Sequence, residues 1–343
     1  FVVGGSHLSN VYGKTIHEIV QDKIKINYKI DYLKNNLKFL ENNFNLVIKN
    51  MIEKFSKFLK KNKVKNIFIV GDRWELVPLV ISAFNLKCNI MHHSGGDYTY
   101  GSKDNYYRSI ISILSNLHFV GNKLHKERLI RMGINASKIY VVGEPSLLNY
   151  KKKKSSKDLI LATLYPSDFE KKKYRDQIKI FLSFLNKIKD KIILTAPGSE
   201  KGSKIFLQHI KNTKGKNIEF YQNLGSEKYN MMMSRAKLMV GNSSSGILEA
   251  SSYKLPVLNI GNRQKGRLKP KNVVDCEFSL KKLISSYKKL KKKSFLNKIK
   301  NVRNPYFKKN CIRDIIKILM KEDFNKKSYN QLIDPIKNLN EYL

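Results

Sequence analysis

The sequence predicts an α/β protein in which two Rossmann-like domains, each a doubly wound parallel sheet, face one another across a cleft. Three observations support this fold class. The chain has 343 residues, more than one hydrophobic core usually serves, so two domains of about 150 residues each are expected. Short apolar runs alternate with amphipathic helical patterns along both halves. Between the halves, residues 151–157 are all lysine or serine, which is typical of an exposed linker.

Each half alternates strand and helix signals in a way that defines the expected elements. In the first half, Leu46, Met51 and Phe55 lie on one face of a helix. After it we expect strands at 66–70, 89–93, 117–120 and 139–143, with helices at 75–84, 105–115 and 124–132. In the second half we expect strands at 159–165, 191–196, 218–222, 237–241 and 256–260, with helices at 170–188, 202–212, 227–236 and 245–253. The strands are continuous apolar runs, as in parallel sheets covered on both faces.

Three regions follow from this pattern: an N-terminal domain over 1–150, a C-terminal domain over 158–303 and a helical tail over 304–343. The tail is broken at Asn304 and Pro305 and ends in an amphipathic run from Ile312 to Met320, which we expect to pack across the domains. The chain opens on an apolar run with neither an initiator methionine nor a leader. We therefore expect that the sequence lacks its true beginning.

The charge balance favours anionic ligands without indicating nucleic acid. The formal net charge is +40, with 67 Lys and Arg against 27 Asp and Glu. Lysine is spread over nearly every segment, whereas a nucleic-acid footprint needs a clustered stripe. We expect no nucleic-acid partner and interpret the lysines near 287–293 as an exposed helix face. No apolar run approaches the roughly 20 residues of a membrane span, so no membrane partner is expected either.

The cysteines do not indicate a metal or a disulfide framework. Cys88, Cys276 and Cys311 lie far apart, and none has a C-x-x-C spacing. A reducing cytoplasm fits this usage.

The most informative segment is a serine-rich loop, residues 241–249, between an apolar strand and a short helix. Small side chains let the backbone approach a phosphate, the hydroxyls of Ser243 and Ser244 can donate to its oxygens, and a helix start favours negative charge. Glu249 follows about one turn later, where its carboxylate could accept from ribose hydroxyls. The alternative is an ordinary serine N-cap with a capping-box glutamate, although three serines exceed what a cap requires.

A basic turn, residues 261–267, follows the next strand at its carboxyl end. Arg263 and Arg267 offer planar guanidinium donors that suit a diphosphate. On so basic a protein, a solvated surface turn is the alternative interpretation.

Charged residues also crowd the end of the strand at 66–70. Asp72, Arg73 and Glu75 stand where this strand gives way to a helix. A carboxylate beside a guanidinium suits acid or base work and anion binding. The alternative is an N-cap aspartate with a surface ion pair.

Two histidines, two carboxylates and an arginine follow the next strand. His92 and His93 end it, a double glycine comes after, and then Asp97, Asp104 and Arg108. Adjacent strand residues point to opposite faces, so at most one of the two histidines enters the cleft, and their spacing does not suit a metal. We therefore expect no metal site.

Taken together and in order, these segments resemble the hydrolysing UDP-N-acetylglucosamine 2-epimerase family. Any one motif is weak, but the match is spread over most of the chain. It rests on residues 5–8, 12–13, 71–75, 95–99, 117–119, 142–145, 223–225, 241–249, 261–267 and 304–306.

The resemblance implies two domains of the glycosyltransferase-B type, the second holding most of the nucleotide and the first the sugar. It implies that substrate is bound by His7, Arg73, Ser243, Ser244, Glu249 and Arg263. It implies catalytic roles for Asp72, His92, Asp97 and Asp104.

The chemistry that this family performs needs a base, an acid and anion stabilisation. The C2 proton is removed while UDP departs from C1, and water attacks the resulting glycal-like intermediate to give the 2-epimer. The expected substrate is UDP-N-acetylglucosamine or a UDP-diacetamido-trideoxyhexose, with no cofactor. Members of the family often form dimers or tetramers, so a homo-oligomer is expected.

The chain departs from the family pattern at several positions on the sugar side. Ser94, Asn105, Ser109 and Tyr165 replace residues typical of the family, and the opening strand with its G-T-R-like loop is missing. Two other functions therefore remain open. One is a UDP-sugar-dependent glycosyltransferase of the same fold, which would need an acceptor site. The other is a non-catalytic sugar-nucleotide binder, which the substitutions suggest.

Overall fold

A computed structural model describes residues 1–10, 14–33, 43–100, 102–149, 156–167, 170–197, 202–211, 217–324 and 332–333. Most of the linker predicted at 151–157 lies outside these residues. The contacts of the chain divide it into two compact units. Unit 1 comprises Phe1–Asp97, Lys103–Gly143 and Ile312–Leu343, and unit 2 comprises Tyr98–Ser102 and Glu144–Cys311.

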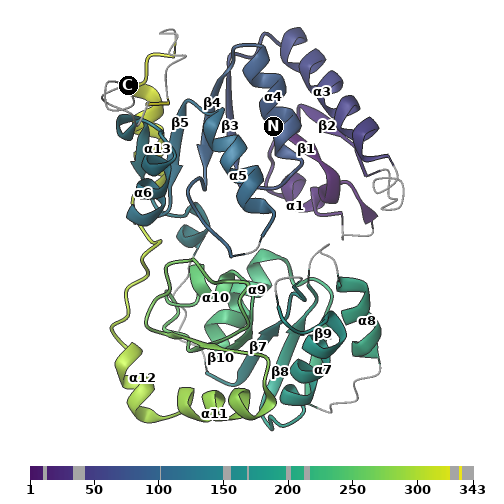
Figure 1. Ribbon diagram of the computed structural model, residues 1–343, viewed down its shortest axis with the longest axis vertical. Coiled ribbons are helices and arrows are strands. Elements are labelled where there is room, and N and C mark those ends of the chain that lie inside the picture. Colours follow the sequence, from purple (N-terminus) through teal and green to yellow (C-terminus); the bar gives the residue numbers. More distant parts are fainter. Residues whose placement is uncertain are drawn as a thin grey trace, which may run out of the picture. The chain divides into compact units, whose positions relative to one another are not determined.

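Unit 1 is built on a four-stranded parallel sheet in the order β3 (Asn66–Val70), β4 (Asn89–His93), β5 (Leu117–Val120) and β6 (Ile139–Val141). The helices α4 (Leu76–Asn85), α5 (Asp104–Ile113) and α6 (Lys123–Arg131) connect successive strands (Figure 1). The predicted strands at 66–70, 89–93 and 117–120 are confirmed at both ends. They form because their apolar side chains are buried, Ile90 and Phe119 completely.

A second, two-stranded parallel sheet in unit 1 joins β1 (Val2–Gly4) to β2 (Tyr28–Ile30), with α1 (Ile16–Gln21) between them in the chain. The long helix α3 (Phe44–Lys61) follows and buries an i, i+4 stripe that includes Val47, Met51 and Phe55. This stripe packs in one core cluster with Ile30 of β2 and Ile90 of β4. The two sheets of unit 1 therefore share a hydrophobic core, although no hydrogen-bonded ladder joins them within the described residues.

The end of the described chain also belongs to unit 1. Helix α13 (Cys311–Lys321) is followed by Glu322, which forms an ion pair with Lys138 at the end of a short 3-10 helix (Ala136–Lys138). Farther on, Leu332 forms an antiparallel bridge with Ile134. The amphipathic helix predicted from Ile312 onward is thus confirmed.

Unit 2 contains a six-stranded sheet in which every neighbouring pair is parallel. Its order is β12 (Val273–Cys276), β11 (Val257–Ile260), β10 (Ala236–Gly241), β7 (Leu159–Thr163), β8 (Lys191–Thr195) and β9 (Ile218–Tyr221). Its helices are α7 (Tyr174–Leu185), α8 (Ser203–Lys211), α9 (Gly225–Arg235), α10 (Ser245–Leu248), α11 (Leu280–Leu290) and α12 (Lys293–Ile299). All five residues of the central strand β7 are buried, and the parallel sheets of both units confirm the predicted α/β fold class.

Two elements of unit 2 differ from the sequence-based expectation. Strand β12 was not predicted, because its short run of two valines carries little periodic signal. The helix predicted at 245–253 ends at Leu248, and the side chain of Asn304 explains why. Its Nδ2 donates to the carbonyl oxygen of Leu248 at 2.7 Å and to Ser252 Oγ at 2.8 Å. That carbonyl is thereby satisfied from outside the helix.

No helix in the described part of the chain is both long and apolar enough to cross a bilayer.

Candidate functional site

The candidate site in unit 1 lies at the carboxyl ends of its parallel strands, where the loops that follow β3, β4 and β5 meet. Gly71, directly after β3, donates its backbone N–H to the carbonyl oxygen of His93 at 3.1 Å. Ser94, directly after β4, donates in the same way to Phe119 at 3.1 Å. These bonds hold the loops at one edge of the sheet, which is where doubly wound folds bind ligands.

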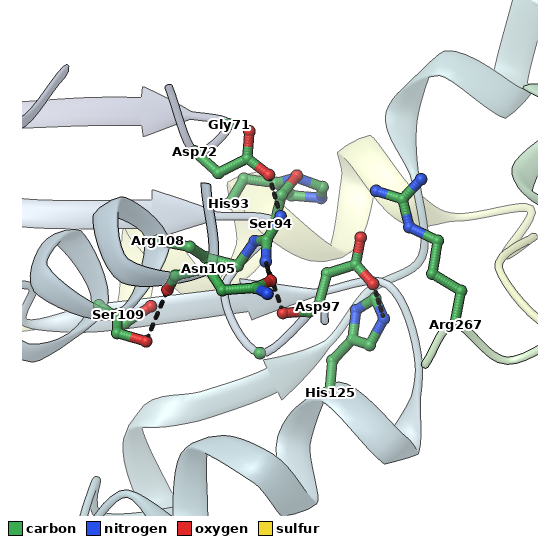
Figure 2. Close-up of polar contacts among 12 residues, drawn as sticks. Gly71, Asp72, His93, Ser94, Asp97, Asn105, Arg108, Ser109, His125 and Arg267 are labelled. Atoms are coloured by element: carbon green, nitrogen blue, oxygen red, sulfur yellow. Dashed lines mark hydrogen bonds and ion pairs between the residues drawn. The ribbon is translucent and has the colours of Figure 1, made fainter. Parts of the chain in front are cut away.

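A buried arginine connects the polar residues at this edge (Figure 2). Arg108, on the inner face of α5, is only 2% exposed. Its Nη2 forms an ion pair with Asp72 Oδ2. Its Nη1 donates to the carbonyl oxygen of Asp97 and to Asn105 Oδ1, both at 2.8 Å. Since a buried guanidinium must be paired, Arg108 fixes the backbone at Asp97 and the carboxylate of Asp72 together.

The carboxylate of Asp97 faces a histidine from the next helix. Asp97 Oδ1 lies 3.4 Å from Nε2 of His125 on α6, and both side chains are at least nine-tenths buried. The double glycine makes this approach possible. Gly96 has φ +72°, and a Cβ there would lie 2.1 Å from the carbonyl oxygen of His125. Only glycine tolerates that position.

His92, on β4, is buried beneath these loops and does not reach the surface. The side chain has no solvent exposure, its Nε2 lies 2.8 Å from the carbonyl oxygen of Gly71, and its Nδ1 lies 3.1 Å from Ser112 Oγ. A carbonyl oxygen can only accept, so Nε2 carries the proton and Nδ1 accepts from the serine. Burial lowers the pKa of His92 to about 4, so the ring is neutral at pH 7. Both ring nitrogens are therefore occupied within the fold.

A second polar group forms around the start of α4. Arg73 Nε donates to Glu75 Oε1 at 2.7 Å, and the hydroxyl of Tyr32 donates to the same oxygen at 3.0 Å. Asp104, at the first position of α5, interacts electrostatically with Arg73. The side chain of Arg73 is more than half exposed, so it remains accessible to an anion.

His7 makes no described contact with either of these polar groups. It ends the 3-10 helix Gly5–His7 after β1, is exposed, and pairs through Nδ1 with Thr15 Oγ1 at 2.8 Å. The structure thus brings Asp72, Asp97 and Asp104 to the edge of one sheet in unit 1, and His7 to the end of the neighbouring two-stranded sheet.

The candidate site in unit 2 begins where β10 ends. Gly241 has φ +130°, and a Cβ there would lie 1.8 Å from the carbonyl oxygen of Thr163. The next residue, Asn242, is fully buried, and its side chain forms two hydrogen bonds with the backbone of Tyr165 after β7. It accepts from the Tyr165 N–H at 2.7 Å and donates to the Tyr165 carbonyl at 2.8 Å. The loops after the two central strands are therefore locked together.

The serines beyond Asn242 line the start of α10. Ser243 Oγ lies 2.9 Å from Ser245 Oγ, which lies 2.6 Å from the hydroxyl of Tyr229. Ser244 occupies the N-cap position but makes no side-chain capping bond, which argues against the ordinary N-cap interpretation for this residue. Glu249 is half-buried, and its carboxylate hydrogen-bonds no other described residue. Burial raises the pKa of Glu249.

The basic turn after β11 packs on the same loop. Arg263 Nη1 donates to the carbonyl oxygen of Asn242 at 3.1 Å, and its guanidinium lies 4.4 Å from the ring centre of Tyr165. Arg267 Nη1 donates to Gln264 Oε1 at 2.8 Å, and Gln264 itself donates to Asn242 at 2.8 Å. The turn is thus held against the serine loop, and Arg263 is stacked in a fixed orientation.

Sequence reasoning did not assign site roles to several residues that hold these groups in place. Arg108 stands four residues after Asp104, so helical spacing could have placed it on the same face. Asn242 and Tyr165 lie 77 residues apart, and only the parallel pairing of β7 with β10 brings them together. Among the described residues, no group of three or more His, Cys, Asp or Glu side chains is arranged to hold a metal.

Comparison with known proteins relates this geometry to a family. A sequence model described as UDP-N-acetylglucosamine 2-epimerase matches residues 1–320. A Campylobacter jejuni protein called GDP/UDP-N,N'-diacetylbacillosamine 2-epimerase (hydrolyzing) is 32% identical over 316 residues, covering 86% of this chain and 80% of that protein. Polysialic acid biosynthesis protein P7 of Escherichia coli is 27% identical over 351 residues, covering 97% of this chain and 89% of that protein.

The fold agrees with a solved structure of the same kind. The crystal structure of UDP-GlcNAc 2-epimerase from Neisseria meningitidis bound to UDP-GlcNAc superposes with a TM-score of 0.76 at 18% identity, covering 94% of this chain and 99% of that one. At this identity the likeness bears on the fold alone. The sequence matches, however, extend over nearly the whole length, and on that ground the chain belongs to the UDP-N-acetylglucosamine 2-epimerase family.

Proposed function

We propose that the protein is a hydrolysing UDP-N-acetylhexosamine 2-epimerase, which converts a UDP-2-acetamido sugar and water into the free 2-epimeric sugar and UDP. The observation that carries this proposal is the Arg108 group, in which one buried guanidinium holds Asp72 and the backbone of Asp97 at the carboxyl end of a parallel sheet. The Campylobacter relative, called a hydrolysing 2-epimerase, supports the hydrolytic form. It also favours a UDP-diacetamido-trideoxyhexose as substrate beside UDP-N-acetylglucosamine.

The groups of unit 2 suit the nucleotide. We assign the diphosphate to the hydroxyls of Ser243 and Ser244 and to Arg263, whose planar donors fit phosphate oxygens. Glu249 is a half-buried acceptor that no described residue uses, and it suits the ribose hydroxyls. Arg73, exposed and beside Glu75, supplies a further cation for the diphosphate region, and His7, also exposed, keeps its assignment to the substrate.

The groups of unit 1 suit the proton transfers. Asp72 is one-quarter exposed and is held in place by Arg108, so it can accept the C2 proton as the bond from C1 to UDP breaks. Asp97, with His125 behind it, and Asp104 are the carboxyl groups available to return a proton to C2 from the opposite face. In the first step Asp72 takes the C2 proton and UDP leaves with the electron pair of the C1–O bond. In the second step one of these carboxyl groups gives a proton to C2 and water gives its hydroxyl to C1, and the remaining proton of that water restores the carboxyl group.

We assign His92 a positioning role within this mechanism rather than contact with the substrate. Its neutral ring hydrogen-bonds the carbonyl oxygen of Gly71, the residue before Asp72, and so fixes the backbone that carries the proposed base. This revises the direct catalytic role that the resemblance implies.

An acceptor-free incubation separates the candidate functions. With purified protein and UDP-N-acetylglucosamine alone, the proposal expects UDP and free N-acetylmannosamine in equal amounts. Formation of UDP-N-acetylmannosamine would indicate the non-hydrolysing reaction, and turnover only with an added acceptor would indicate a glycosyltransferase. Binding of UDP without turnover of either candidate substrate would indicate a sugar-nucleotide binder.

The expectations of a homo-oligomer and of a cytoplasmic location form part of this proposal. Sedimentation of the purified protein tests the first. Among the described residues, Cys88, Cys276 and Cys311 form no disulfide, which fits a reducing compartment.

A further inference from the structure

A lysine-lined groove on unit 2 lies outside every group assigned above. It is formed by the last turn of α11, the first turns of α12 and the residues between them, and its volume is about 720 Å³. Lys288, Lys289, Lys292 and Lys298 line it, together with Phe295 and two serines, and no acidic residue does. This volume falls within the range of small-molecule sites in proteins.

The four lysines of the groove differ from other lysines of unit 2 in their partners. Lys282 pairs with Glu277 at 2.7 Å, Lys237 with Asp190 at 2.7 Å, and Lys269 with Asp275 at 2.6 Å. Neighbouring Lys291 also reaches Asp190, at 3.4 Å. None of the groove lysines forms an ion pair with a described residue. Their charge is therefore not neutralised within the described chain.

The sequence around the groove lacks acids altogether. Residues 278–313 contain eleven lysines and two arginines but no Asp or Glu. In a chain with 27 acidic residues among 343, a segment of this length would hold two or three by an even spread. This segment is thus more positively charged than the overall lysine excess of the chain requires.

The groove is also fixed in shape. Leu290, at the end of α11, and Ile299, at the end of α12, are buried. Phe295 is half-buried against the main core cluster of unit 2. Because both helices are anchored, their lysine stems project from a rigid base, and the four ammonium groups repel one another unless an anion lies between them.

We propose that this groove binds a compact polyphosphate-type anion, with several negative charges shared among the four lysines. A groove lined by seven residues on one helical corner suits a small anion better than a nucleic acid or a membrane surface. The site is separate from the serine loop, and its existence does not depend on the proposed epimerase activity.

Calorimetry with inorganic tripolyphosphate at low ionic strength tests the proposal, with saturating UDP present so that the nucleotide site is blocked. The wild-type chain binds about one tripolyphosphate. The variant K288Q/K289Q/K292Q/K298Q loses at least about tenfold in affinity, and the matching four-arginine variant retains binding. The control K54Q/K57Q/K60Q/K61Q, on the exposed face of α3, removes the same charge and leaves binding unchanged. Retained near-ultraviolet circular dichroism shows that each variant is folded.

Three results would overturn the proposal. The first is equal loss in the groove and control variants, which would mean a response to net charge alone. The second is binding of many tripolyphosphates per chain. The third is no binding of tripolyphosphate together with groove-dependent binding of duplex DNA or of phosphatidylserine vesicles, which would assign the groove to a macromolecular partner.

Discussion

Arg108 and Asp72 form an ion pair in which the guanidinium is almost fully buried and the carboxylate reaches the surface. Arg108 holds Asp72 through its Oδ2 atom, and about a quarter of the Asp72 side chain stays exposed to solvent. Because Arg108 also holds the backbone of Asp97, the two carboxyl-bearing loops cannot move independently.

Replacing Asp72 by Asn removes the proposed base while keeping its shape. We expect kcat to fall by about 100-fold to 10,000-fold, the usual worth of a positioned acid or base. The affinity for UDP should stay within about twofold, because most of the groups proposed for the nucleotide belong to unit 2 and Arg73 itself is unchanged. Steady-state rates of UDP release and calorimetry with UDP measure the two quantities. Asp22→Asn, an exposed change on unit 1, is the matched control; an active Asp72→Asn enzyme would exclude Asp72 as the base.

Replacing Arg108 by Met should damage both stability and turnover. Removing one partner of a buried ion pair leaves the other uncompensated and typically costs about 3–5 kcal/mol. We therefore expect a clear fall in Tm as well as a loss of activity at least as large as that of Asp72→Asn. In the double variant Arg108→Met with Asp72→Leu, part of the stability should return while activity stays lost. An unchanged Tm in the single variant would show that the pair does not hold the loops.

Replacing Arg263 by Ala should weaken UDP binding with little effect on kcat at saturation. Hydrogen bonds to charged groups contribute about 1.5–3 kcal/mol, which corresponds to roughly 10-fold to 150-fold in Kd. Arg263→Lys should recover only part of this, because lysine keeps the charge but loses the planar fork and the stacking on Tyr165. Arg313→Ala on the exposed side of α13 serves as the control. Equal affinities for UDP in all three variants would remove Arg263 from the nucleotide site.

Glu249 should make UDP binding sensitive to mild acid. Burial raises the pKa of its carboxyl above the ordinary value of 4.5, so the acceptor is lost by protonation at a higher pH than for an exposed glutamate. UDP affinity should therefore begin to fall at a higher pH than an exposed glutamate would allow. Glu249→Gln should bind more weakly at pH 7 and show a shallower pH dependence, set by the terminal phosphate of UDP with its second pKa of about 6. The exposed control Glu227→Gln should keep the full dependence. If Glu249 contacts the ribose, its replacement by Ala should also reduce the preference for UDP over 2′-deoxy-UDP.

Two buried histidines should make unit 1 sensitive to acid. Burial lowers the pKa of His92 to about 4 and that of His118 to about 3, whereas both have a pKa of 6.5 when unfolded. The unfolded chain therefore binds protons first, and stability is lost as the pH falls from 6.5 toward 4. Each histidine contributes a slope of about 1.4 kcal/mol per pH unit in that window.

Urea unfolding at pH 7, 6 and 5 measures this dependence. His118→Leu should reduce the slope by about one proton, and the exposed control His17→Leu should leave it unchanged. A stability that does not vary between pH 7 and 5 in the wild type would show that these rings are not buried as described.

The fold followed from the sequence because its strands are continuous apolar runs with glycine or polar residues at their ends. Strand β3 is an example, because its apolar run from Ile67 to Val70 is followed directly by Gly71 and Asp72. The positions of Asp72, Asp97, Ser243 and Arg263 at strand ends could be predicted for the same reason, since parallel strands bring their carboxyl ends to one edge.

What the sequence could not supply were the contacts made across the sheet and between helices. The burial of His92 depends on Gly71 and Ser112, which lie 21 and 20 residues from it in opposite directions along the chain. The early end of α10 depends on Asn304, 56 residues beyond Leu248. The groove lysines looked like a solvated helix face, because only the fold brings Lys298 of α12 beside Lys288 of α11. Local periodicity carries no information about such pairings.

The fate of the hydrogen at C2 of the sugar tests the central claim most directly. When the reaction runs in D₂O with UDP-N-acetylglucosamine or the UDP-diacetamido-trideoxyhexose, NMR and mass spectrometry of the free sugar should show one deuterium at C2 with inverted configuration, and Asp72→Asn should abolish its incorporation. A released sugar that keeps both its original C2 hydrogen and its configuration would mean simple hydrolysis, and would contradict the mechanism assigned to Asp72.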